Sequence, residues 1–405
     1  KKYRGKAFIK ILGIPIKVSK KYYSSVYGPT LKNKTGFFSV RTGSLFKVRG
    51  LEQWWKMNKA SSFKEFYSIL EMNEIPGYNI GYADKDDNIF YISNGLIPKR
   101  NNKYKWTDVL PGNNSETLWT EYYKTSELPQ VINPKSGYIY NANHSPFKST
   151  SLNENPNPEN FNSNMGFETF DNNRSTRIFE LIESFNAIDY KDFKTIKYDN
   201  KFPTPFNYNF MDINNIMEMD PINYPEISDL LEQIQKWDRV TDANSTGAGA
   251  YAMFYYTLAE KYFYKSYYDR NFSKDLIADC LKDVKEKMIK YFNSSTVKLG
   301  EYQKLVRGNK EMPIFGMPDV ITAMTASKYS NGKIHVTHGE SYIQLVKFSK
   351  KGVEIESIIS YGSSDHKDSP HYNDQMELYS KFKTKKMSFD KDYVLKNART
   401  TYNPK

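Results

Sequence analysis

Two neighbouring segments near the C-terminal end alternate apolar and polar side chains, and this alternation constrains the fold more than any other feature. In Ile343-Gln344-Leu345-Val346-Lys347-Phe348 the apolar residues recur mostly at every second position. Strand side chains alternate between two faces, so the pattern predicts strands with one face toward a core. The strands predicted in this region span residues 334–336, 342–348 and 353–361.

Strand groups and helix groups follow one another along the chain in blocks. Residues 7–18 and 36–41 favour strands, and a hairpin is predicted at 78–84 and 89–92 around an acidic turn. Such blocks indicate an α+β fold with mostly antiparallel sheets rather than a doubly wound parallel sheet. Helices are predicted at 51–72 in two pieces, the second opened by a capping box from Ser62 to Glu65, and at 174–185, 225–238, 248–267 and 273–292, the last with Ser273 as N-cap.

These blocks suggest three parts of the chain. Residues 1–174 are expected to form a β-rich part of the core, and residues 175–325 a mainly helical lobe. Residues 326–405 carry strands that are expected to return to the core.

Composition excludes some classes of protein. The formal net charge of +12 comes mainly from Lys, and we interpret it as spread along the chain over a solvated surface. Nucleic-acid binding would require that charge to cluster on one element, so no nucleic-acid partner is expected. The lone cysteine, Cys280, lies in a helical pattern and is expected to be a small core residue. No apolar run is long enough for a membrane span, and no signal peptide opens the chain at Lys1.

Spacing alone defines no self-contained catalytic set. The sequence has no Gly-rich phosphate loop, no His-Glu-x-x-His helix and no Gly-x-Ser-x-Gly elbow. His335 and His338 would lie on opposite faces of a strand, which disfavours a shared metal. A metal at His366 and His371 stays open, although no cysteine or second cluster joins them.

The stretch from Asn133 to Pro146 is the centre of the candidate site. It predicts a turn, then a short strand at 138–140, with Asn141 and Asn143 at the strand end. Two interpretations stay open here. Both asparagines could cap the turn through local hydrogen bonds, or an Asn amide could act as an oriented donor for an oxyanion.

Several stretches, in the same order, resemble the β subunit of the penicillin acylase family, which belongs to the N-terminal-nucleophile hydrolases. The resemblance runs from about residue 25 to the end of the chain and leans towards the branch that cleaves N-acyl homoserine lactones and acylated lipopeptides. The stretches that carry it are Tyr27-Gly28-Pro29, Tyr82-Ala83-Asp84, Gly95 to Arg100, Asn133 to Pro146, Arg174 to Ile178, Trp237-Asp238, Gly247 to Phe254, Gly339 to Tyr342, Tyr361 to Ser364 and Ser369 to Gln375.

The resemblance implies a four-layer αββα core, incomplete in this chain, with a mostly helical lobe. It also implies an amide hydrolase that matures by cutting itself and attacks the N-acyl amide of penicillin-like, acyl-homoserine-lactone or lipopeptide substrates. Its nucleophile is a Ser, sometimes Cys, at the β-chain N-terminus. Carried over by position, Asn143 is the oxyanion-hole donor and Arg174 positions groups of the site. Because the first residue is Lys1, the nucleophile is expected outside this chain.

The same resemblance implies partners and a location. The partners are a small N-acyl amide substrate and the rest of its own precursor, namely the α subunit and the N-terminal part of the β subunit. The location is periplasmic or secreted. No cofactor is expected, and a structural calcium, which some relatives bind, stays open. The alternative function is a catalytically dead binding or scaffold protein of the same fold, and the residue that begins the full β chain would distinguish the two.

Overall fold

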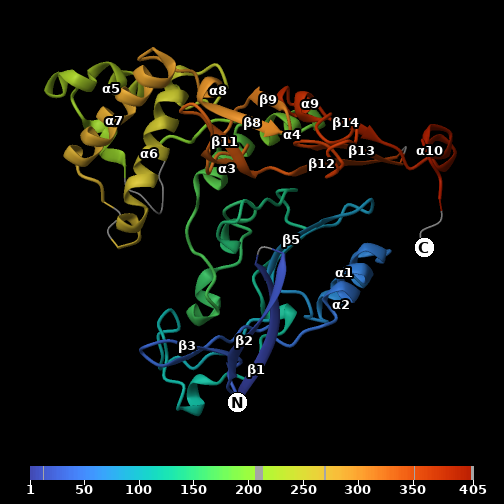
Figure 1. Ribbon diagram of the computed structural model, residues 1–405. Coiled ribbons are helices and arrows are strands. Elements are labelled where there is room, and N and C mark those ends of the chain that lie inside the picture. The colour runs from blue at the N-terminus through green and yellow to red at the C-terminus, as the bar shows by residue number, and fades with distance from the viewer. Residues whose placement is uncertain (12, 206–212, 269–270, 351, 403–405) are drawn as a thin grey trace. The chain divides into compact units, whose positions relative to one another are not determined.

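A computed structural model gives the fold for residues 1–402, except residues 12, 206–212, 269–270 and 351. The chain forms two compact units, Lys1–Phe170 and Asp171–Lys405, and each is described here by itself (Figure 1). The sequence predicts three parts, 1–174, 175–325 and 326–405, whose boundaries differ from those of the two units. This division stays a prediction.

The first unit holds two antiparallel sheets and two short helices. One sheet has the order β1-β2-β3-β4 and the other the order β5-β6-β7. The strands predicted at 7–18 and 36–41, the hairpin and the pair of helices are confirmed. The elements are β1 (Lys2–Ile11), β2 (Ile14–Ser24), β3 (Pro29–Lys32), β4 (Phe37–Ser39), α1 (Gly50–Lys59), α2 (Phe63–Leu70), β5 (Tyr78–Ala83), β6 (Ile89–Asn94) and β7 (Gln130–Ile132).

Helix α2 begins with half of the predicted capping box. The hydroxyl of Ser62 accepts a hydrogen bond from the backbone N–H of Glu65, 3.3 Å away. The Glu65 carboxylate, however, accepts from the backbone N–H and the hydroxyl of Ser61, each at 2.8 Å, in place of the Ser62 N–H. The apolar face of the helix then buries Phe66 and Leu70 against Phe90 and Ile92 of β6.

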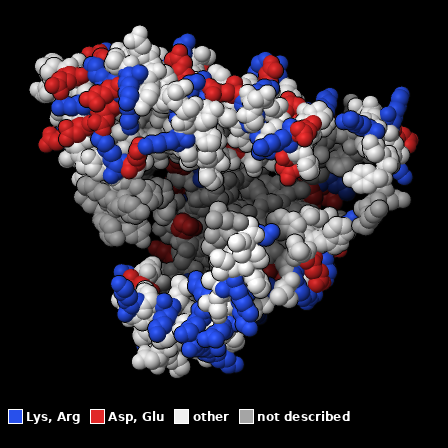
Figure 2. Space-filling view, viewed as in Figure 1, with Lys and Arg blue, Asp and Glu red and all other residues white. Residues whose placement is uncertain are grey.

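The predicted spread of positive charge is wrong. Residues 1–50 contain 13 Lys and Arg and no Asp or Glu, whereas the rest of the chain has 45 basic and 46 acidic residues. In Figure 2 basic side chains gather over the N-terminal strands, and both signs mix over the helices of the second unit. The β1–β2 register places Arg4 opposite Lys21, and it places Ile9 opposite Ile16 on the other face. The hairpin therefore has one basic face and one apolar face.

The second unit combines helices with two more sheets, and the predicted helices and strands in it are confirmed. One sheet has the order β10-β11-β8-β9, in which only β11 and β8 are paired parallel among the described strands, and the other has the order β12-β13-β14. The elements are α3 (Asn173–Glu183), α4 (Tyr190–Lys197), α5 (Ser228–Gln235), α6 (Thr246–Tyr268), α7 (Lys274–Phe292), α8 (Leu299–Tyr302), β8 (Gln303–Arg307), β9 (Lys310–Pro313), β10 (Met324–Lys328), β11 (Ile334–Gly339), β12 (Tyr342–Ser349), β13 (Gly352–Ile359), α9 (Met376–Ser380), β14 (Lys385–Met387) and α10 (Lys391–Asn397).

Alternation in β12 has the expected consequence. Ile343 and Leu345 are buried, and Gln344 between them is exposed. At the other end of the unit, the hydroxyl of Ser273 accepts from the backbone N–H of Leu276 and so caps α7, as the sequence predicts.

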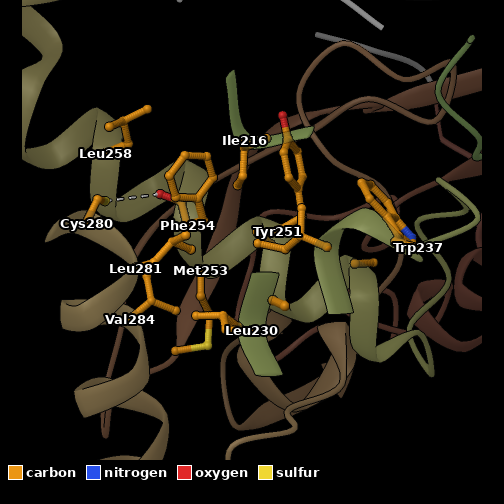
Figure 3. Close-up of a cluster of buried hydrophobic side chains, with 14 of the residues drawn as sticks. Ile216, Leu230, Trp237, Tyr251, Met253, Phe254, Leu258, Cys280, Leu281 and Val284 are labelled. Carbon is orange, nitrogen blue, oxygen red and sulfur yellow. Dashed lines mark hydrogen bonds between the residues drawn. The ribbon is translucent and has the colours of Figure 1, made fainter. Parts of the chain in front are cut away.

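One hydrophobic core of the second unit lies between α5, α6 and α7 (Figure 3). The rings of Trp237 and Tyr251 stack with centroids 5.1 Å apart. Cys280 is buried beside the Phe254 carbonyl, and burial raises the pKa of its thiol to about 12. Because Cys280 is fully buried within this core, the prediction of a core cysteine is confirmed.

Candidate functional site

The stretch around Asn143 differs from its predicted form. Residues 138–140 are not a strand, so the predicted strand-end position of Asn143 is wrong. The backbone N–H of Tyr140 donates to the Ser149 carbonyl, 2.9 Å away, and the Thr150 hydroxyl donates to the Tyr138 carbonyl at 2.8 Å. These bonds connect the stretch to an irregular loop rather than to a neighbouring β-strand.

Asn143 itself sits in a bend with a positive φ of 57° and an exposed side chain. Its backbone N–H donates to Oδ1 of Asn141, 2.9 Å away, so the Asn141 side chain caps the turn, the first of the two interpretations left open for it. The Asn141 amide also donates to the hydroxyl of Tyr91 at 3.3 Å. Asparagine tolerates the left-handed conformation better than most residues, which explains its presence at position 143.

His144 anchors this loop, a role that sequence reasoning missed. Its ring is 2% exposed and stacks on Tyr140, with centroids 5.0 Å apart. Nδ1 accepts from the backbone N–H of Ala142 at 3.1 Å, so Nε2 carries the proton and donates to the Lys148 carbonyl at 2.7 Å. Both ring nitrogens are thus engaged by the backbone, and the imidazole holds the shape of the loop beside Asn143.

Arg174 lies in the first turn of α3, whose N-cap is Asn172. Its guanidinium Nε donates to Oδ1 of Asp319, 3.2 Å away. The other carboxylate oxygen of Asp319 accepts from the backbone N–H and the side-chain amide of Asn173, at 3.0 and 2.9 Å. Asp319 therefore fixes both the start of the helix and the Arg174 side chain. No local sequence pattern links positions so far apart, so this partner was missed.

Burial of Asp319 raises the pKa of its carboxyl above the ordinary value of 3.8, because desolvation outweighs the hydrogen bonds from Asn173 and the charge of Arg174. A raised folded-state pKa means that the folded protein binds the proton more tightly than the unfolded chain. We therefore expect this group to contribute less stability as pH rises from about 3.8 through the folded pKa.

Asp319→Asn tests that sign. Urea unfolding of both proteins over this acidic range is expected to show a free energy of unfolding that rises less with pH in the wild type than in the variant. Equal slopes in the two proteins would contradict the assignment.

The two predicted site residues stand in different units, Asn143 in the first and Arg174 in the second. The structure therefore leaves the predicted roles of both residues as proposals.

No three side chains of His, Cys, Asp or Glu gather to hold a metal within the described part of the chain. In the acidic turn after β5, the Asp84 carboxylate is bonded within the turn. It accepts from the hydroxyl of Tyr82 and from the backbone N–H groups of Asp86 and Asn88. Nδ1 of His371 donates to the carboxylate of Asp374, 2.8 Å away, and His366 lies exposed beside Asp365. Among the described residues, His366 and His371 thus each lie beside a different carboxylate, Asp365 and Asp374.

Comparison with solved structures identifies the class of fold. The chain is similar over its whole length to a thermostable penicillin G acylase from Alcaligenes faecalis, with a TM-score of 0.65, 15% sequence identity and 81% of that chain covered. This likeness confirms the predicted α+β fold of the N-terminal-nucleophile hydrolases.

The sequence profile described as penicillin amidase matches residues 4–396, so this chain belongs to the penicillin amidase family. It is 21% identical over 430 residues to the acyl-homoserine lactone acylase PvdQ of Pseudomonas syringae pv. syringae (strain B728a), an alignment that covers 92% of this chain and 53% of that protein. It is 28% identical over 130 residues to the penicillin G acylase of Escherichia coli, covering 31% of this chain and 15% of that protein. The chain thus spans about half the length of the curated relatives that it matches along most of its sequence.

No helix of the described residues is both long enough and apolar enough to pass through a bilayer.

Proposed function

We propose that this chain is part of an amide hydrolase that cleaves N-acyl amide bonds. The observation that carries the proposal is the family match over residues 4–396. The relatives named above are acylases, and their names point to N-acyl homoserine lactones and penicillin G as substrates of those proteins. For this protein we propose the same broad class, including acylated lipopeptides, in a periplasmic or secreted location.

The proposed chemistry proceeds through an acyl-enzyme. A Ser at the N-terminus of the β chain attacks the amide carbonyl, and its own α-amine removes the hydroxyl proton. The amine component of the substrate then leaves with that proton, and water hydrolyses the ester. Because the chain covers only about half the length of the acylases that it matches, the proposal places the nucleophile in a part of the protein outside this chain and upstream of it. That upstream part, with the α subunit, is the proposed partner of this chain.

Two residues of this chain have proposed roles in the reaction. We propose that the Asn143 amide donates to the oxyanion and that Arg174 positions groups of the site. Asn143 is exposed, and its bend is held by Asn141 and His144. The proposed role of Arg174 is supported by its hydrogen bond to the carboxylate of Asp319, which fixes the direction of the guanidinium.

Asn143→Ala in the complete protein is expected to reduce kcat by roughly a hundredfold or more, because an oxyanion-hole donor contributes about that much. The assay follows release of the fatty acid from an N-acyl homoserine lactone. Asn157→Ala, which removes a short cap on an exposed loop, is the matched control and should leave kcat unchanged. A kcat for Asn143→Ala equal to that of the wild type would remove this residue from the mechanism.

The second candidate function is a binding or scaffold protein that has lost the chemistry. It is favoured if the residue that begins the complete β chain is not Ser, Thr or Cys. Reading that residue from the complete open reading frame decides between the two before any assay.

A further inference from the structure

The hairpin of β1 and β2 extends from its sheet as a two-stranded arm. β1 is the edge strand, and it is paired with β2 along its whole length, Lys2–Ile11. β2 in turn pairs with β3 only at Tyr23 and Ser24, at the base of the hairpin. At about 3.4 Å per residue, the 10 residues of β1 make an arm roughly 30 Å long. A lone two-stranded hairpin is at best marginally stable in water, so a surface that receives this arm would stabilise it.

The outer half of the arm, residues 8–11 and 14–18, exposes apolar side chains to solvent. These exposed apolar residues are Phe8, Ile9, Ile14, Ile16 and Val18. Phe8, with 69% of its surface exposed, is the most open of them. A sheet edge that is protected only against aggregation carries charges in such places, and soluble proteins rarely group exposed apolar residues. The group therefore marks an interaction site.

The inner half of the arm, residues 1–6 and 19–24, is basic. Its cationic residues are Lys1, Lys2, Arg4, Lys6, Lys20 and Lys21. None of these side chains forms an ion pair within the part of the chain that the structure describes, and residues 1–50 contain no Asp or Glu at all. Tyr3 lies opposite Tyr22 among these cations. Tyrosine next to basic residues is typical of protein segments at the boundary between a bilayer and water.

Two further lysines, Lys10 and Lys17, lie on the basic face of the outer half. Lys10 is opposite Pro15 in the register, and Lys17 is opposite Phe8. A lysine side chain is long enough to carry its ammonium group back along the arm while its methylenes stay among apolar groups. Both ammonium groups can therefore reach the same layer as the cations of the inner half.

We propose that this arm inserts its outer half into the surface of a bilayer that contains anionic phospholipid. The apolar side chains enter the interfacial region, and the cations contact the lipid phosphates. A flat protein surface would cover one face of the arm and leave the other in water. A nucleic acid would contact the cations but would offer no apolar surface to Ile14 and Ile16. A bilayer surrounds an inserted tip and so meets both faces at once. This inference is independent of the proposed amide hydrolysis.

The first test is co-sedimentation of the complete protein with lipid vesicles. Vesicles of phosphatidylglycerol and phosphatidylcholine are expected to bind it at least about tenfold more tightly than vesicles of phosphatidylcholine alone, because each basic residue near an anionic surface adds roughly fivefold. Lys20→Gln combined with Lys21→Gln is expected to weaken binding to the anionic vesicles by about tenfold or more. Phe8→Ser combined with Ile14→Ser should weaken it by a similar factor, because it removes the apolar tip.

The matched control is Lys391→Gln combined with Lys396→Gln, which removes the same charge from the exposed helix α10. It should change the affinity for anionic vesicles by less than about threefold, since exposed charges remote from the surface are screened by salt. The side chains substituted in the arm are all exposed, so both arm variants should keep the wild-type Tm. Equal binding by the wild type and both arm variants would overturn the proposal, as would tighter binding to a DNA duplex than to anionic vesicles.

The second test locates the tip itself through Phe8→Trp in the complete protein. The additional tryptophan emission is expected at long wavelength in the absence of vesicles, because this position is exposed. It should shift to shorter wavelength on anionic vesicles and stay unshifted on phosphatidylcholine alone. Emission already at short wavelength without vesicles would mean that another part of the protein covers the tip, and the proposal would then be wrong.

Discussion

Residues 1–405 alone are expected to release no fatty acid from an N-acyl homoserine lactone and no phenylacetate from penicillin G. An N-terminal-nucleophile enzyme needs the hydroxyl and the α-amine on the same residue. Lys1 has the amine without a hydroxyl or a thiol, and the amine donates to the Ser24 carbonyl at the base of the β1–β2 hairpin. Nothing at this terminus can therefore form the acyl-enzyme.

The measurement compares the isolated chain with the same chain produced together with the proposed upstream part. Turnover is expected only in the second preparation. The control is the complete protein with its N-terminal Ser replaced by Ala, which should be as inactive as the isolated chain. Steady turnover by residues 1–405 alone would refute the placement of the nucleophile.

Phe254→Ala is expected to lower the free energy of unfolding by about 3–5 kcal/mol, the usual cost of deleting a buried phenyl ring. Phe254 lies in α6 at the centre of the helical core, is 0% exposed, and contacts the ring of Tyr251 with centroids 6.3 Å apart (Figure 3). The surrounding residues come from three helices and cannot all move into the cavity. The loss therefore includes both the transfer of the ring and the void that it leaves.

Urea unfolding followed by far-UV circular dichroism measures this loss. Tyr393→Ala, on the exposed helix α10, is the control and should change the free energy of unfolding by less than about 0.5 kcal/mol. A change of similar size for the two variants would mean that the helical core contributes little to stability.

The sequence predicted most elements because their patterns are local. The alternation in Ile343 and Leu345 defined β12, and the cap at Ser273 defined the start of α7. The aromatic and β-branched residues of segment 138–140 favour a strand, but the segment is not one. The backbone of Tyr138 and Tyr140 bonds instead to Thr150 and Ser149 of the loop.

The candidate site was less predictable than the fold. Asp319 contacts Arg174 across a long separation in sequence, and no local pattern indicates such a pair. The role of His144 depends on two backbone groups that only the folded loop brings to its ring. The charge of the N-terminal strands, by contrast, was readable in the sequence and was misjudged because Lys is common throughout the chain.

The most direct test of the proposed hydrolase is the intact mass of the complete, matured protein after brief exposure to an N-acyl homoserine lactone. The account predicts a covalent acyl adduct on the N-terminal residue of the complete β chain, which is proposed to lie upstream of residue 1. The adduct should disappear as free fatty acid accumulates. An unmodified protein that also releases no fatty acid from any N-acyl amide would contradict the hydrolase and favour the binding protein of the same fold.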